Sequence, residues 1–333
     1  MTRTIDLHAH VIVPEILRDA APDEAWRPRV WRDDQGRVFE VGGREVRSGV
    51  REWSDLEQVL ADQDAAGTDM VVLSPVVMLL GHDADPQEGL RRARIQNEGL
   101  ARLVEARPDR IGALGTVPLQ DPALAADELR SLMSDGVLAG VEVAASAGGT
   151  YLGDDAFEPF WAAAEETGAL VFIHPTTRGF PAPVFQEHYL WNAVGNPLET
   201  TVTAAHLIMT GTMERHPGVR VLLAHGGGAI LSLRGRLRHC HSFQPQARSR
   251  LVESPEDSLR RFYFDTVVHD PGLLRILVET VGADRVVLGS DHPFDMGDLT
   301  PAATVRAAGL DAGDEAAVLG GNAAALLGLE VTT

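Results

Sequence analysis

Eight short apolar runs, separated by longer amphipathic or polar segments, constrain the fold more than any other feature of this sequence. The runs are rich in β-branched residues and cover residues 4–10, 69–74, 111–117, 138–144, 169–174, 219–225, 262–268 and 285–291. Strands that alternate with helices form parallel βαβ units, and eight such units close into a barrel. We therefore predict an α/β protein in which residues 1–333 form a single (β/α)₈ (TIM) barrel domain. An open doubly wound sheet is the alternative, but no GxGxxG motif follows the first run.

Two connections are longer than ordinary βα loops. Residues 14–55 contain RVFEVGGREVRS, which predicts a β-hairpin that turns at Gly42-Gly43. Residues 176–200 are rich in proline, glycine and aromatic residues. Both connections follow the C-terminal end of a predicted strand, which is the end of a barrel where active sites are built. We expect residues 14–55 to be a small N-terminal insertion that covers part of the site.

The composition excludes several classes of protein. The formal net charge of −19 argues against non-specific binding of nucleic acid. No apolar run approaches the roughly 20 residues that cross a bilayer, and the N-terminus lacks the pattern of a signal peptide. Cys240 is the single cysteine, so no intrachain disulfide can form, and we predict a cytoplasmic protein. All 29 basic residues are arginines, which excludes Schiff-base chemistry through lysine and any metal site bridged by a carboxylated lysine.

Ionisable residues gather at the ends of four predicted strands. His8 and His10 lie two apart on the first strand, so their side chains share one face. The fifth strand ends at His174, the sixth at His225 and the eighth at Asp291. Three imidazoles and a carboxylate suit a borderline divalent ion such as Zn²⁺, and an open coordination position would carry water. The pattern predicts a metal site at the mouth of the barrel.

These strand ends resemble the metal-site pattern of the amidohydrolase superfamily. Two longer stretches, residues 195–237 with LLAHGGG and residues 262–299 with LGSDHPF, resemble the family of 2-amino-3-carboxymuconate-6-semialdehyde (ACMS) decarboxylase. The resemblance implies an amidohydrolase-like barrel with one zinc ion, whose ligands would be His8, His10, His174 and Asp291. It also implies that His225, together with Asp291, is catalytic and acts on water held by the metal.

The resemblance further implies several substrate contacts. Arg236, eleven residues after His225, matches an arginine that reaches the site of a neighbouring subunit, which implies a homodimer. A planar guanidinium suits a carboxylate because it can bind both oxygens at once. Trp191 matches an aromatic residue of the substrate pocket. For a second substrate arginine, the insertion offers Arg51 and Arg47.

This chain departs from the family pattern at positions expected to contact the substrate. His292 stands where ACMS decarboxylases have an aromatic residue after the strand-8 aspartate, so we include it among the substrate-binding candidates. The resemblance implies non-oxidative, metal-dependent decarboxylation of an unsaturated or aromatic carboxylic acid, with no partner other than this small molecule and a second copy of the chain. Metal-dependent hydrolysis of an amide, lactone or ester is the alternative, because the same activated water could attack a carbonyl carbon. A metal-binding protein without turnover is a third class.

Overall fold

The computed structural model describes residues 3–48, 51–176 and 183–329. Eight of its strands are parallel and form the central barrel: β1 (Ile5–Val11), β5 (Met70–Pro75), β6 (Ile111–Ala113), β7 (Gly140–Ala144), β10 (Leu170–His174), β11 (Arg220–Leu223), β12 (Tyr263–Asp265) and β13 (Val286–Val287). Each overlaps one of the eight predicted runs. The prediction of strands is therefore confirmed, although several are shorter than the apolar run that contains them.

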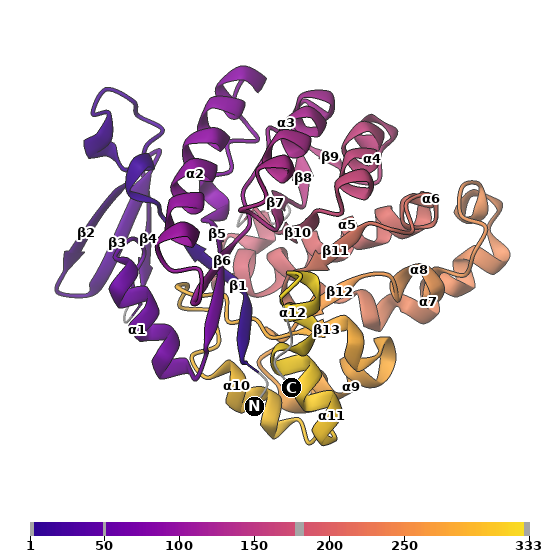
Figure 1. Ribbon diagram of the computed structural model, residues 1–333. Helices are drawn as coiled ribbons and strands as arrows, with labels where there is room; N and C mark the ends of the chain where they lie inside the picture. Colours follow the sequence, from indigo (N-terminus) through magenta and orange to yellow (C-terminus); the bar gives the residue numbers. More distant parts are fainter. Residues whose placement is uncertain (1–2, 49–50, 177–182, 330–333) are drawn as a thin grey trace.

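Strand pairing closes these eight strands into a ring (Figure 1). The strands β1, β5 and β6 pair in that order, and β13, β12, β11, β10 and β7 form a second series. A parallel bridge between Gly115 and Val141 joins the two series on one side, and a bridge between Ala9 and His292 joins them on the other. The architecture is the predicted (β/α)₈ barrel, and the open sheet is excluded.

A ring of helices covers the outside of the barrel (Figure 1). They are α1 (Leu56–Ala66), α2 (Pro86–Ala106), α3 (Pro122–Asp135), α4 (Glu158–Thr167), α5 (Asn196–Met209), α6 (Thr212–Arg215), α7 (Ile230–Phe243), α8 (Pro255–Leu259), α9 (Pro271–Val281), α10 (Pro301–Ala307), α11 (Ala312–Ala316) and α12 (Asn322–Leu326). Three begin in the same way, with an aspartate side chain that accepts a backbone N–H and a proline directly after it: Asp85, Asp121 and Asp270. None of the helices that the structure describes has the length and apolar character needed to cross a bilayer.

A slip in strand register decides which way the paired histidines point. Between Asp6 and Ala9, the pairing of β1 with β5 shifts by one residue. Ile5, before the slip, packs with the apolar residues inside the barrel, whereas Ala9, after it, packs with the layer between strands and helices. A one-residue slip moves the following side chains to the opposite face of a strand. His8 and His10 therefore point into the barrel mouth instead of towards the helices.

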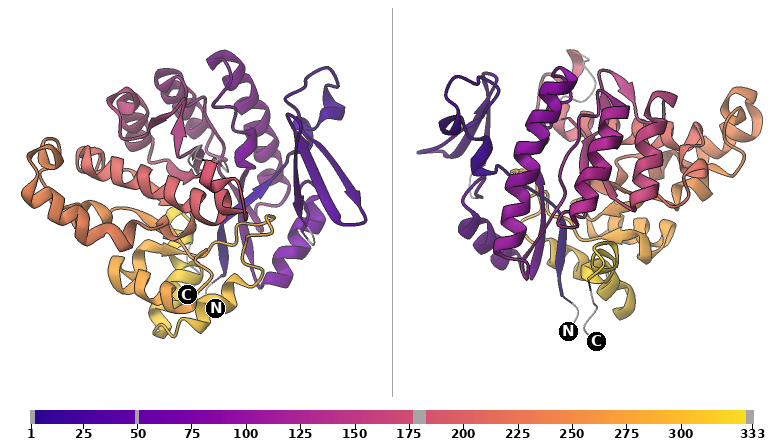
Figure 2. Two further views of the ribbon diagram at one scale, coloured as in Figure 1. Left: turned by 180° about the vertical axis from the view of Figure 1, so that it is seen from behind. Right: turned by 45° about the horizontal axis from the view of Figure 1, so that its top comes forward.

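The N-terminal insertion forms a small antiparallel sheet beside the barrel (Figures 1 and 2). Its strands are β2 (Arg29–Asp33), β3 (Gly36–Val41) and β4 (Arg44–Ser48). The predicted hairpin is confirmed: Gly42 and Gly43 turn the chain with φ of 57° and 75°, a region that glycine occupies without strain. Phe39 and Trp53 are fully buried, and the Trp53 ring lies 5.2 Å from the ring of Phe294, which anchors the insertion to the loop after β13. A further short hairpin, β8 (Ser146–Ala147) and β9 (Thr150–Tyr151), follows β7.

Candidate metal centre

Five ionisable side chains converge at the C-terminal mouth of the barrel, because they stand at the ends of strands that are parallel. The Nε2 atoms of His8 and His10 are 3.2 Å apart, and they lie 3.2 and 3.3 Å from Asp291 Oδ1. His174 Nε2 lies 3.9 Å from the same oxygen, and His225 Nε2 lies 3.4 Å from Asp291 Oδ2. The structure thus brings together all five residues that the sequence placed at strand ends.

Three of these histidines are oriented by a hydrogen bond from the ring nitrogen that faces away from the centre. In His8, His10 and His174 the Nδ1–H donates to an oxygen. The acceptors are, in the same order, Asp265 Oδ2 at 2.6 Å, the carbonyl of Pro75 at 3.0 Å and the carbonyl of Pro175 at 2.8 Å. Because carbonyl and carboxylate oxygens only accept, each Nδ1 carries the hydrogen and each Nε2 presents a lone pair. This is how proteins turn imidazoles towards a metal.

The arrangement fits a divalent cation. Asp291 Oδ1 and His174 Nε2 are buried, and neither atom has a hydrogen-bond partner. The Nε2 atoms of His8 and His10 face each other at 3.2 Å, so a positive charge is needed between them, and either protons or a metal ion can supply it. Ligand atoms within 4.8 Å of one another are offered by His8, His174, His225 and Asp291. His10 also belongs to this centre, since its Nε2 is nearer to Asp291 Oδ1 than that of His174 is.

Protons and a metal would compete for these lone pairs. Burial alone would lower the pKa of His8, but the charge of Asp291 and the hydrogen bond to Asp265 outweigh it and raise the pKa to about 10. Burial also opposes protonation of His10, but the charge of Glu142 and the contact with Asp291 raise its pKa to about 9. Asp291 itself is buried, which would raise its pKa, yet the neighbouring imidazoles hold it well below the usual value. A cation that binds here must therefore displace protons.

The segment that carries His225 is held by one buried carboxylate. His225 and Asp291 both adopt left-handed backbone angles, with φ of 57° and 58°, which costs about 1–3 kcal/mol for residues other than glycine. Asp265, which is fully buried, accepts the backbone N–H of His225 at 2.9 Å and that of Gly226 at 2.8 Å. The same Asp265 oxygen that accepts from His225 also accepts the ring N–H of His8. One side chain therefore fixes both a candidate ligand and the candidate catalytic histidine.

The sequence reading missed Asp265 and Glu142. Asp265 is the last residue of β12, inside the predicted run 262–268, so its place at a strand end was the signal that could have identified it. Glu142 lies within β7, is fully buried, and has an oxygen 3.4 Å from His10 Nδ1. A charged residue in the middle of an apolar strand was the corresponding signal, since buried carboxylates need partners.

The two arginines proposed from the insertion occupy different surroundings. Arg51 is 6 % exposed, and its guanidinium donates to the carbonyl of Asp298 at 2.7 Å. The backbone N–H of Asp298 donates to the carbonyl of Ser290, the residue before Asp291, at 2.8 Å, which places Arg51 near the metal centre. Arg47 instead pairs with Asp33 at 2.7 Å on the small sheet of the insertion, and its side chain is 38 % exposed. The structure therefore brings Arg51, and not Arg47, close to the site.

The remaining three substrate candidates lie in different surroundings. Arg236 is exposed on α7 and has no hydrogen-bond or ion-pair partner among the described residues. Trp191 is half-buried, and its ring lies 4.8 Å from that of Tyr189. His292 is 1 % exposed, and its Nε2 faces a carboxylate oxygen of Asp62 at 3.4 Å. The His292 side chain thus turns into the protein, although the preceding residue, Asp291, faces the metal centre.

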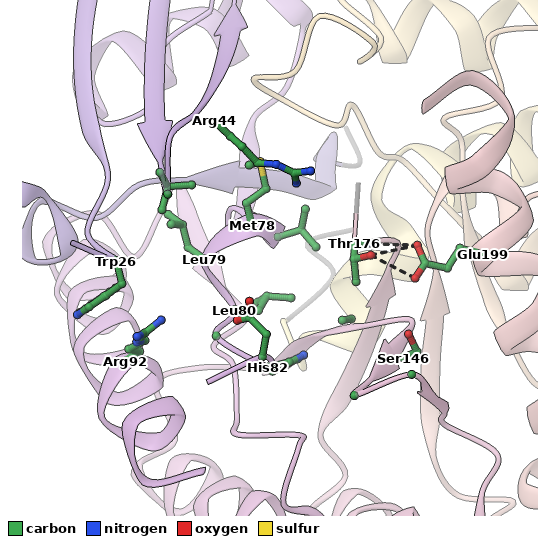
Figure 3. Close-up of a pocket in the computed structure, with 18 residues that line it drawn as sticks. Trp26, Arg44, Met78, Leu79, Leu80, His82, Arg92, Ser146, Thr176 and Glu199 are labelled. Atoms are coloured by element: carbon green, nitrogen blue, oxygen red, sulfur yellow. Dashed lines mark hydrogen bonds between the residues drawn. The ribbon is translucent and has the colours of Figure 1, made fainter. Parts of the chain in front are cut away.

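The structure describes two cavities near the C-terminal mouth of the barrel. The metal cavity has a volume of about 260 Å³ and is lined by His174, His225 and Asp291, together with apolar groups of the loops after β12 and β13. The outer cavity, of about 590 Å³, lies between the insertion and the ends of β5, β7 and β10. Figure 3 shows the apolar side chains of Met78, Leu79 and Leu80 and, to their right, Thr176, which donates to Glu199. Residues 177–182 lie outside the described residues.

The sequence profile of the amidohydrolase family matches residues 5–329. The chain belongs to the amidohydrolase family. This amidohydrolase is 32 % identical over 264 residues to 2-amino-3-carboxymuconate-6-semialdehyde decarboxylase of Dictyostelium discoideum, a match that covers 79 % of this chain and 73 % of that protein.

Solved structures share the fold of this amidohydrolase. The 5-carboxyvanillate decarboxylase of Sphingomonas paucimobilis is 25 % identical with a TM-score of 0.79, and the match covers 99 % of this chain and 100 % of the other. A dihydroxybenzoic acid decarboxylase of Polaromonas sp. JS666, with bound manganese and the inhibitor 2-nitroresorcinol, is 22 % identical with a TM-score of 0.80 over 98 % and 97 % of the two chains. Both likenesses confirm the barrel that the sequence predicted.

Proposed function

We propose that this amidohydrolase is a metal-dependent, non-oxidative decarboxylase of aromatic or unsaturated carboxylic acids. The observation that carries the proposal is the set of inward-facing imidazoles around Asp291, whose Oδ1 is buried without a hydrogen-bond partner. Relatives that are similar along most of this chain are decarboxylases by name. A divalent ion bound by these side chains would supply a Lewis acid that fixes an oxygen of the substrate.

We propose His8, His10, His174 and Asp291 as the ligands. Imidazole nitrogens and carboxylate oxygens are donors that Zn²⁺ accepts in proteins, which is why we favour zinc. The Polaromonas relative holds manganese, so the test of this point is metal analysis of the purified protein and reactivation of the stripped protein with each ion.

In the proposed reaction, the bond between the substrate carbon and its carboxylate breaks, carbon dioxide leaves, and a proton takes its place. We assign the handling of that proton to His225 and Asp291. The His225 side chain is 16 % exposed and lines the metal cavity, and its Nδ1 is buried without a partner. General acid–base catalysis by a positioned histidine contributes about 10²–10⁴-fold in rate. Replacement of His225 by alanine should therefore remove turnover and leave the metal bound.

We propose that the active form is a homodimer in which Arg236 completes the site of the neighbouring subunit. Helix α7 buries only Ile230 and Leu231 of its 14 residues, so most of its surface is free for a partner. It stands at the opposite end of the molecule from the insertion (Figure 2). Within one chain, we propose Arg51 and Trp191 as substrate contacts.

Product analysis with isotope-labelled water distinguishes a decarboxylase from a hydrolase. Metal-loaded protein should release carbon dioxide from an aromatic acid, and in deuterated water one deuterium should appear on the carbon that carried the carboxylate. If ¹⁸O from water enters a new carboxylate of an amide, ester or lactone instead, and no acid in the panel releases carbon dioxide, the protein is a hydrolase.

We propose a cytoplasmic location, supported by the single cysteine, Cys240, which fits a reducing compartment. We also propose that residues 1–333 act as a single domain. The net charge of −19 supports a small molecule, and no nucleic acid, as the partner besides a second copy of the chain.

A further inference from the structure

Asn196 is a buried polar residue of the metal cavity that has no assigned task. It is the first residue of α5, it is 4 % exposed, and it lines the same cavity as His174, His225 and Asp291. Its Oδ1 is buried without a hydrogen-bond partner, and its amide nitrogen has none among the described residues. Leaving a buried acceptor without a partner is unfavourable, so the Oδ1 atom of Asn196 needs an explanation.

The position of Asn196 is fixed relative to His225. A side chain at Gly228 would meet the carbonyl of Pro197 at 2.1 Å, so only glycine lets the segment after His225 lie directly against the start of α5. The hydroxyl of Thr201 accepts the backbone N–H of Ala229 at 2.8 Å and donates to Pro197, which ties the two segments together. The amide of Asn196 is therefore held at a fixed place on the wall beside the candidate catalytic histidine.

Apart from Asn196 and the residues of the metal centre, the polar residues that line this cavity are Asn192 and His269. Val267, Val268, Phe294 and Met296 line the metal cavity with apolar atoms. An aromatic ring suits such walls, and its carboxylate would lie towards the metal ligands. A substituent on the ring that reaches Asn196 must hydrogen-bond to an amide. A hydroxyl group meets this need whichever way the amide is turned, because it can both donate and accept.

We infer that Asn196 is a specificity-determining residue that binds a hydroxyl substituent on the ring of the substrate, so that the enzyme takes hydroxylated aromatic acids in preference to their alkyl analogues. The inference rests on the proposed function, since it assumes that the ring lies in the metal cavity. A site built around a buried hydrogen-bonding group rejects ligands that lack the matching group, because the protein atom then stays unpaired. A ligand bound in the outer cavity would not depend on Asn196.

The test uses two probes that cannot be decarboxylated. These are 2-nitroresorcinol and 2-nitro-m-xylene, which share a ring and a nitro group and differ in two hydroxyls replaced by methyls. Dissociation constants are measured with the metal-loaded full chain. The wild type should bind the resorcinol at least about tenfold more tightly, and Asn196→Leu should weaken binding of the resorcinol alone, removing most of that preference. Metal content should be unchanged. Asn196→Ala serves in the same assay if leucine disturbs folding.

A matched control separates specificity from structure. Asn97 is also buried, but its amide donates to the carbonyl of Thr116 and accepts the N–H of the same residue. Asn97→Leu should lower the unfolding temperature, whereas Asn196→Leu should leave it equal or higher, because it removes an unpaired amide. The inference is overturned if Asn196→Leu keeps the preference, if it weakens both probes equally, or if the wild type shows no preference. The proposed function fails separately, by the absence of carbon dioxide release.

Discussion

Replacing Asp265 by asparagine should weaken metal binding, although Asp265 is not a ligand. Its two oxygens accept four N–H groups: the ring of His8 and the backbone of His225 at Oδ2, and the backbone of Gly226 and Val267 at Oδ1. Asparagine keeps one of these oxygens and presents N–H groups in place of the other. Two of the four buried N–H groups then face the new amide NH₂ and lose their acceptor. Each lost hydrogen bond costs about 1–3 kcal/mol, so the free energy of unfolding should fall by roughly 2–6 kcal/mol.

The loss of the negative charge acts on the metal centre itself. The Asp265 carboxylate raises the basicity of His8 and fixes its orientation, and partners of this kind are worth about 10–100-fold in metal affinity. Competition with a chromogenic chelator measures that affinity in Asp265→Asn and in the control Glu52→Gln. Glu52 likewise accepts backbone N–H groups, of Trp53 and Ser54, but touches no ligand. Equal metal affinity in the wild type and Asp265→Asn would refute the reasoning.

Three further predictions concern other groups. Burial lowers the pKa of His82 from 6.5 to about 4, so as pH falls the unfolded chain takes up this proton before the folded chain does. The free energy of unfolding should therefore fall by up to about 3 kcal/mol between pH 6.5 and pH 4. Urea unfolding of His82→Gln should show a smaller decrease over the same pH range. Metal binding at pH 7 should release protons, because the pKa values of His8 and His10 are raised to about 10 and about 9. Calorimetry in buffers of different ionisation enthalpy measures the number of protons released. Metal binding without proton release would contradict the assignment of His8 and His10 as ligands. Mixing inactive His225→Ala protein with inactive Arg236→Ala protein should restore roughly a quarter of wild-type activity, since about half of randomly assorted dimers are mixed and each of these holds one intact site out of two. If no activity returns after verified subunit exchange, Arg236 does not serve the site of the neighbouring subunit.

The sequence by itself determined the barrel and the place of its metal centre. The alternation of apolar runs with helical segments is a local pattern, and eight such units favour a closed barrel over an open sheet. Parallel strands end at one face of the barrel, so His174 and Asp291 had to meet there, although they are 117 positions apart in the chain. The hairpin at Gly42-Gly43 was predictable for a similar reason, because a tight turn depends only on its own residues.

Tertiary structure decided which groups support and surround that centre. A slip in the pairing of β1 with β5 turns His8 and His10 into the barrel, and the sequence of β1 shows only that they share a face. Arg51 and Arg47 are four residues apart and chemically alike, yet one is buried near Asp291 and the other pairs with a surface aspartate. Burial, long-range hydrogen bonds and the choice of partner depend on segments far apart in the chain, so no local pattern could reveal them.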